Sequence, residues 1–315
     1  MFQRLSNSWE LVKASWRVLL ADKELMLFPL VAFFASVLVM ITFAVPTVLA
    51  GVLDSTVTNG ELGIFSYIIA FLFYAVMYFV TIFSNTALVG AAMIRLGIFG
   101  IINKPSIRKC LKQIPKNSMI SLNYFSESAL DGGDPTVGDG FRIAFSKIGA
   151  IFGYAFIAAT VGTILRMISE RSGAIGKLVV SLVGFVWTIA TFLVIPVLVV
   201  EDVGPLDAVK RSASLLRETW GEQIAGNLSV GLIFGLIFFL VILAGVPLIF
   251  AAIATGSVAL IVTAVAFVVL LLVGISLVSS TLSGIYTAAV YRFATTGDTG
   301  GYFEADMVQK AFKQK

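Results

Sequence analysis

Few side chains in this sequence could do chemistry, and the first candidates are two adjacent carboxylates, Glu201 and Asp202, directly after an apolar run. A carboxylate pair can do acid–base work, but no nucleophile or metal motif accompanies it. Histidine is absent and Cys110 is the only cysteine, which excludes Cys/His zinc sites, histidine bases and an intrachain disulfide. We therefore expect no catalytic site and no cofactor.

A second group of acids lies in the stretch "LDGGDPTVGDG", which contains Asp131, Asp134 and Asp139. Three acids suggest calcium, but their spacing fits no EF-hand loop. The dense glycine and proline indicate turns, and Asp139 is suited to cap a helix that begins near Phe141. We expect a turn here rather than a metal site.

The third group consists of polar side chains inside long apolar stretches. One cluster holds Ser84, Asn85 and Thr86, and the other holds Ser276, Ser279, Ser280, Ser283 and Thr287. These groups could line a polar path or hold a ligand. In membranes, small hydroxyl residues more often join helices, at less than about 1 kcal/mol each. We favour this structural interpretation, and Asn85 is the residue to mutate first.

The composition shows what kind of element carries these groups. The 315 residues are 58% hydrophobic and 13% charged, with a mean hydropathy of +0.99, whereas soluble domains carry about 25% charged residues. This is the composition of a polytopic membrane protein. The first apolar run, Leu25–Leu53, is much longer than the roughly 7–15-residue core of a secretory signal, so we interpret it as a span.

Charges delimit the spans, because about 20 apolar residues are needed to cross about 30 Å of hydrocarbon. The uncharged runs are Leu25–Leu53, Leu62–Ile94, Ile148–Leu165, Leu178–Val200 and Gln223–Tyr291. The last is long enough for two spans with a tight turn near Thr255–Gly256–Ser257. Continuous apolar runs favour helices over a barrel. The sequence therefore predicts an all-α, polytopic membrane helical bundle with six transmembrane helices.

Lysine and arginine are concentrated on one side of this scheme. They lie in the N-terminal segment, between spans 2 and 3, between spans 4 and 5, and in the C-terminal tail, whereas the other side holds only Arg166, Arg171 and Lys177. The positive-inside rule then places both termini in the cytoplasm. We expect a multi-pass protein of the plasma or inner membrane.

The chain is predicted to form a single membrane domain, 1–315. Its parts are a cytoplasmic amphipathic helix in 1–24, spans 1–2 in 25–95, a basic cytoplasmic insertion and loop in 96–142, spans 3–4 in 143–200, an amphipathic helix in 201–222, spans 5–6 in 223–292, and a cytoplasmic tail in 293–315.

Two pairs of segments suggest an internal repeat. "AAMIRL" at 91–96 resembles "AAVYRF" at 288–293, and "VKASWRVLL" at 12–20 resembles "VKRSASLLR" at 209–217, with the same separation in both pairs. We interpret spans 1–2 and 5–6 as two copies of a surface helix followed by a hairpin, with spans 3–4 as the candidate third copy. Both copies cross the membrane in the same direction, so the repeat is parallel. The alternative is chance similarity between apolar segments.

Amphipathic helices precede the two repeated hairpins. Apolar residues form one stripe in each: Leu5, Trp9, Val12, Trp16 and Leu19 in the first, and Leu206, Val209, Ala213, Leu216 and Trp220 in the second. Basic helices with tryptophan can lie in the membrane interface. They could equally pack on neighbouring spans, and both interpretations stay open. Trp9, Trp16 and Trp220 are the lipid-interface candidates.

Residues 103–116, "NKPSIRKCLKQIPK", form a basic segment without a negative charge. Such clusters beside a span bind anionic lipid, at about 1 kcal/mol per charge. The candidate lipid-binding residues are Lys104, Arg108, Lys109, Lys112 and Lys116. The alternative is that these charges only determine topology. Nucleic acid is not expected as a partner, because a membrane-tethered basic patch meets lipid first.

Four stretches carry a family resemblance: "SWELVKASWRVLLADKELMLFP", "GGDPTVGDGFRIAFSKIGAIFGYA", "VIPVLVVEDVGPLDAVKRSASLLRETWGE" and "YRFATTGDTGGYFEADMVQKAF". The chain resembles a group of six-span prokaryotic membrane proteins of unknown function. It is distantly similar to the membrane domain of some glycerophosphodiester phosphodiesterases. The resemblance covers most of the chain and departs at about 97–129, which we interpret as an insertion. It implies a bacterial-type plasma-membrane protein and no particular catalytic residue.

Uncharged spans, one-sided charge and tryptophan-bearing surface helices together predict a non-enzymatic, lipid-interacting membrane organiser or scaffold. Its expected partners are anionic membrane lipids and further copies of itself in a homo-oligomer. The alternative is a passive channel or uncoupled transporter for a small solute or lipid, using the polar faces of spans 2 and 6. A coupled pump is disfavoured, because the spans hold almost no ionisable groups. An enzyme acting on lipid through Glu201 and Asp202 is the least favoured alternative.

Overall fold

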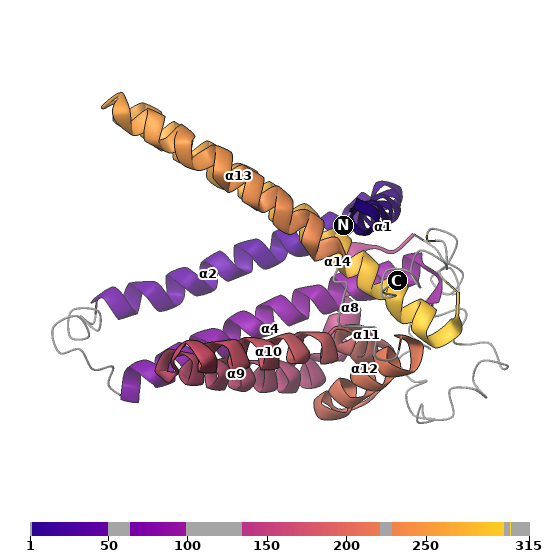
Figure 1. Cartoon of the computed structure of the whole chain (residues 1–315). Helices are drawn as coiled ribbons and strands as arrows, with labels where there is room; N and C mark the ends of the chain where they lie inside the picture. The colour runs from indigo at the N-terminus through magenta and orange to yellow at the C-terminus, as the bar shows by residue number, and fades with distance from the viewer. Residues whose placement is uncertain (1, 50–63, 99–133, 221–228, 299–302, 304–315) are drawn as a thin grey trace.

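A computed structural model describes residues 2–49, 64–98, 134–220, 229–298 and 303. Every regular element among them is helical (Figure 1). Six helical segments are long and apolar enough to cross a membrane, as predicted: Lys23–Val45, Ile68–Arg95, Ile148–Arg171, Ala174–Val200, Ile233–Ala254 and Val258–Thr296. The fold is therefore an all-α polytopic helical bundle.

The long helices form three hairpins, each preceded by a shorter helix. The first unit consists of α1 (Phe2–Ala21), the 3-10 helix η1 (Lys23–Met26), α2 (Leu27–Leu49) and α4 (Ile64–Arg95). The second consists of α8 (Val137–Ser146), α9 (Ile148–Arg171), α10 (Ala174–Ala190) and α11 (Val194–Val200). The third consists of α12 (Pro205–Trp220), α13 (Ser229–Ala254) and α14 (Val258–Thr296).

The short helices of the second and third units pack against the hairpin of the preceding unit. That of the first unit packs against the third hairpin, so the three units form a closed cycle. Helix α8 lies along α4, α12 contacts α11 and α10, and α1 contacts α13 and α14. Helix α4 is central, because α2, α8, α9, α11 and α14 all contact it. The buried core consequently lies at the end of the molecule that holds the short helices, where α1 lies and α14 ends (Figure 1).

Away from this core the hairpins separate. In Figure 1 the α13–α14 hairpin leaves the α2–α4 hairpin at a wide angle. Large apolar side chains on these arms are exposed: Phe34 and Leu38 on α2 by 63% and 66%, and Phe250 on α13 by 66%. Helices that are apolar all round suit hydrocarbon surroundings rather than water.

The predicted turn between spans 5 and 6 is present. Helix α13 ends at Ala254 and α14 begins at Val258. Gly256 between them has φ +68°, a left-handed conformation that glycine adopts at little cost. Ser257 caps α14, since its hydroxyl accepts a hydrogen bond from the Leu260 backbone N–H at 3.5 Å.

Spans 3 and 4 differ from the sequence prediction. Helix α9 does not end at Leu165 but continues to Arg171, with Arg166 paired to Glu170 at 2.8 Å one turn later. The fourth span begins at Ala174 and is interrupted at residues 191–193 between α10 and α11. Pro196 explains the interruption, because a proline lacks the N–H that would bond one turn back and its ring crowds that carbonyl.

The predicted stripes are only partly buried: Val12 and Leu19 of α1 and Leu216 of α12 are buried, but other members are not. In α1, Ala14 and Ser15 are fully buried, whereas Trp9 and Trp16 are 49% and 42% exposed. Leu11 and Val18 are fully buried as well, so the buried face of α1 is turned away from both tryptophans. In α12, Leu206 of the predicted stripe is likewise 60% exposed.

Three predicted features lie outside the described residues. These are the basic segment at 103–116, the loop acid Asp131 and most of the C-terminal tail. The side chains of Leu5 and Trp220 are also outside the description, although their helices are within it.

Candidate functional site

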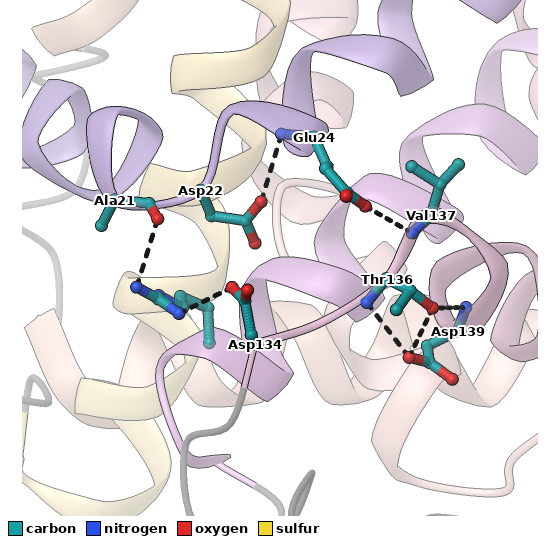
Figure 2. A network of polar contacts seen from close by, with 8 residues as sticks. Ala21, Asp22, Glu24, Asp134, Thr136, Val137 and Asp139 are labelled. Carbon is teal, nitrogen blue, oxygen red and sulfur yellow. Dashed lines mark hydrogen bonds and ion pairs between the residues drawn. The ribbon is translucent and has the colours of Figure 1, made fainter.

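A polar junction joins α1, α4 and the start of α8 (Figure 2). Arg95 donates from Nη1 to Asp134 Oδ1 at 3.0 Å and from Nη2 to the Ala21 carbonyl at 3.3 Å. The Glu24 carboxylate accepts the Val137 backbone N–H at 3.1 Å. These contacts tie the first surface helix to both the first hairpin and the second surface helix.

Helix α8 begins with a reciprocal cap. The Thr136 hydroxyl accepts the Asp139 N–H at 3.2 Å, and the Asp139 carboxylate accepts the Thr136 N–H at 3.1 Å. Asp139 therefore takes part in capping the helix, as predicted, but the predicted helix start near Phe141 is wrong. The helix begins at Val137, and Asp139 lies inside its first turn. No group of acids among the described residues is arranged to hold a metal ion.

Asp22 is the buried acid of this junction, with 4% of its surface exposed. Its Oδ1 accepts the Glu24 N–H at 3.2 Å, but Oδ2 has no hydrogen-bond partner within the described part of the chain. Burial, with a further contribution from the nearby Asp134 carboxylate, raises the pKa of Asp22 above its usual 3.8. Its charge is therefore disfavoured in the folded protein.

We expect Asp22→Asn to stabilise the protein at neutral pH by about 1 kcal/mol. Asparagine keeps an acceptor for the Glu24 N–H and removes the disfavoured charge. Because the folded-state pKa is raised, the stability from protonated Asp22 is full below about pH 3.8 and is lost as the pH rises through the raised pKa. Thermal unfolding in detergent should show the largest gain at pH 7 and a smaller gain toward pH 4. A variant less stable than the wild type at pH 7 would contradict this.

A second polar cluster surrounds Glu201, which directly follows α11 and is 4% exposed. Its two carboxylate oxygens accept from Arg211 Nε of α12 at 3.2 and 3.0 Å, and Oε1 also accepts from the Tyr291 hydroxyl of α14 at 3.0 Å. Burial raises the pKa of Glu201 above 4.5, and Arg211 and Tyr291 oppose part of that effect. Glu201 thus connects three helices.

Asp202 has a separate partner, Lys147 at the start of α9, with 2.8 Å between Oδ1 and Nζ. The two adjacent acids therefore bond to different elements of the fold. Sequence reasoning identified Glu201 and Asp202 but not Arg211, Tyr291 or Lys147. Tyr291 lies 90 residues from Glu201 and Lys147 lies 55 residues from Asp202, so no local pattern connects them.

The polar residues of spans 2 and 6 have different surroundings. Ser84 and Thr86 are buried, and the Thr86 hydroxyl donates to the Ile82 carbonyl at 2.7 Å. Asn85 and Ser280 instead line a crevice. Ser279 and Ser283 of α14 are half-buried and are not among the residues that line it.

The crevice has a volume of about 430 Å³ and lies among α2, α4, α13 and α14. Its polar groups are Ser36, Thr81, Asn85, Ser276 and Ser280, and its other lining residues are apolar. None of the residues described as lining it is ionisable. It is consequently an uncharged, mainly apolar site with one carboxamide.

On the core side of the crevice, α4 and α14 touch. A Cβ atom added to Gly284 would lie 2.5 Å from Leu88 Cδ2. Leu88, Leu282 and Ile285 are at most 1% exposed. Within the described residues, packed side chains therefore close the crevice on that side, toward the short helices.

The outward face of α1 is a separate candidate site. Trp9, Lys13, Trp16, Arg17 and Leu20 are exposed on one helical face, and the exposed acid Glu10 lies at its edge. Lys13 Nζ lies 6.0 Å from the centroid of the Trp9 ring. A helix that combines aromatic, aliphatic and basic side chains on one exposed surface has the chemistry of an interfacial membrane contact.

The fold and these sites define a polytopic α-helical membrane protein with an uncharged interhelical crevice and a tryptophan-bearing surface helix. A family model, described as a family of unknown function (DUF6159), matches residues 64–102 and 124–302. The match covers more than half of the chain, so the chain belongs to this family. It omits 103–123, inside the segment predicted as an insertion. Comparisons with curated proteins and with solved structures find no match.

Proposed function

We propose that this protein organises membrane lipid, binding anionic lipid at the interface through the outward face of α1. The observation that supports this proposal is that Trp9 and Trp16 are exposed beside Lys13 and Arg17, while the opposite face of α1 is buried. Tryptophan prefers the membrane interface. Each basic side chain near an anionic surface contributes about 1 kcal/mol.

The proposal places the protein in the plasma or inner membrane with both termini cytoplasmic, and assigns it no catalytic role. One-sided positive charge in the sequence supports this orientation. The partners of Glu201 and Asp202 support a structural role for these acids. The resemblance to six-span prokaryotic membrane proteins suggests a bacterial-type setting, and self-association stays a prediction.

The proposal includes a parallel repeat of surface helix and hairpin. Under the sequence repeat, Leu11, Ser15 and Val18 of α1 correspond to Ala208, Ser212 and Leu215 of α12, and all six are buried. The equivalent arginines, Arg95 and Arg292, each pair with an aspartate, although Asp298 lies just after α14 and Asp134 lies before α8. These parallels support duplication over chance similarity.

Tryptophan fluorescence of the whole protein in nanodiscs tests the role of α1. In a Trp187→Phe, Trp220→Phe background, Trp9 and Trp16 should be quenched by lipids brominated near the head of the acyl chain. Adding Lys13→Gln and Arg17→Gln should reduce the enrichment of anionic over zwitterionic lipid around the protein severalfold. Lys177→Gln, at the far end of the molecule, is the control. Unquenched tryptophans together with unchanged enrichment would overturn the proposal.

A passive transporter for a small solute or lipid is the second candidate, and the crevice beside Asn85 favours it. The contact between Leu88 and Gly284 argues for a pocket that opens toward lipid rather than a water path. Solute-loaded vesicles that leak no faster with the protein than without it would remove the channel form of this candidate.

A further inference from the structure

We propose that the crevice among α2, α4, α13 and α14 binds one neutral glycerolipid of the diacylglycerol class. In this assignment the Asn85 amide donates to an ester carbonyl of the lipid, and the acyl chains run between the diverging arms α2 and α13–α14. This site is distinct from the outward face of α1, and neither depends on the other.

The first argument is the hydrogen bonding of the Asn85 side chain. Its neighbours on α4 bond within the helix: the Thr81 hydroxyl donates to the Met77 carbonyl at 2.8 Å and the Thr86 hydroxyl to the Ile82 carbonyl at 2.7 Å. The Asn85 carboxamide has no hydrogen bond to any residue that the structure describes, and it faces the crevice. An amide without a partner is costly in apolar surroundings. A polar group from outside the chain therefore completes this site.

The second argument is the depth of Asn85 in the membrane. Helix α14 begins at Val258, beside the turn at the tip of the third hairpin. Helix α4 begins at Ile64, at the corresponding tip of the first hairpin. Twenty helical residues span about 30 Å, the thickness of the hydrocarbon core. From these starts they reach Phe83 and Leu277. Asn85 and Ser280 therefore lie at the other hydrocarbon boundary, where the ester groups of the lipids are found.

The third argument is charge and closure. The lining has no cationic side chain for a phosphate, and the contact between Leu88 and Gly284 closes the core side, where a charged headgroup would have to extend. Ser276 and Ser280, one helical turn apart, add hydroxyls suited to a lipid hydroxyl. The volume of about 430 Å³ is within the roughly 300–1,000 Å³ of small-molecule sites. An uncharged glycerol ester meets all of these conditions.

A diacylglycerol probe with a photoactivatable acyl chain tests the proposal on the purified full-length protein in nanodiscs. We expect cross-links on α2 and α14 near the crevice and competition by unlabelled diacylglycerol. Asn85→Leu should lower probe retention about fivefold, the factor for one net hydrogen bond. Ala32→Trp, which fills the crevice without changing its polar groups, should abolish retention. Thr263→Leu, an exposed polar-to-apolar change elsewhere on α14, is the matched control.

Equal competition by phosphatidylglycerol would overturn the neutral-lipid assignment. Unchanged retention in both Asn85→Leu and Ala32→Trp would overturn the site itself, and the second variant keeps the test valid if the first fails to fold. The Lys13→Gln, Arg17→Gln protein should retain the probe normally, so failure of the α1 proposal is distinguishable from failure of this one.

Discussion

Replacing Glu201 with alanine should destabilise the protein by about 3–5 kcal/mol, the largest loss we expect from a polar substitution. The carboxylate is buried and accepts hydrogen bonds from Arg211 and Tyr291. Without this carboxylate, the Arg211 guanidinium, which is only 19% exposed, loses its acceptor. The buried Tyr291 hydroxyl loses its acceptor as well. The free energy of unfolding in detergent micelles measures the loss.

Asp207→Ala is the matched control, because Asp207 pairs with Lys210 while both side chains are well exposed, at 67% and 78%. Exposed pairs contribute little, so we expect a change within about 0.5 kcal/mol. Glu201→Gln should lose less than Glu201→Ala, since it keeps an oxygen acceptor and burial already disfavours the charge. Equal stability of Glu201→Ala and the control would show that α11, α12 and α14 do not depend on this junction.

Adding a single methyl group at Gly140 should destabilise the protein by about 3 kcal/mol. A Cβ at Gly140 would lie 2.5 Å from Phe28 Cζ and 2.6 Å from the Ala87 carbonyl oxygen. The ring can move, but the carbonyl belongs to the backbone of α4, so α8 must shift away from α4. Thermal unfolding of Gly140→Ala in detergent measures this effect.

Gly149→Ala on α9 is the control, because no atom lies within 4 Å of its added Cβ. Alanine is favoured over glycine in helices, so we expect a gain of up to about 1 kcal/mol there. Combining Gly140→Ala with Phe28→Leu should recover only part of the stability, since the clash with the carbonyl remains. Should Gly140→Ala unfold at the temperature of the wild type, α8 and α4 cannot be in such close contact.

The number and type of the long helices follow from the sequence alone. Hydrocarbon requires about 20 apolar residues per crossing and internal backbone hydrogen bonding, and both are local properties. The turn at Gly256 is local in the same way. The break before Pro196 was also available from the sequence, because a proline disrupts the preceding turn whatever surrounds it. Charged residues alone, which delimit the span, do not reveal this break.

The buried faces of the surface helices were decided by tertiary structure. In α1, the spacing of Trp9, Val12 and Trp16 predicted one apolar stripe, but the buried face combines Val12 and Leu19 of that stripe with Leu11, Ala14, Ser15 and Val18. The buried face includes leucine and valine as well as alanine and serine, so the periodicity of apolar residues did not decide which side of the helix is covered. That depends on the shape of the partner, which the periodicity of one helix does not contain.

The polar residues show the same division. Hydropathy identified Ser84, Asn85 and Thr86 as the polar positions of an apolar span, but not their different surroundings. Successive residues on a helix point about 100° apart, so Ser84 and Thr86 are buried in the core while Asn85 faces the crevice. Local sequence determined which segments cross the membrane. Only the way the hairpins cross and diverge decided which side chains meet a neighbouring helix and which face the space between them.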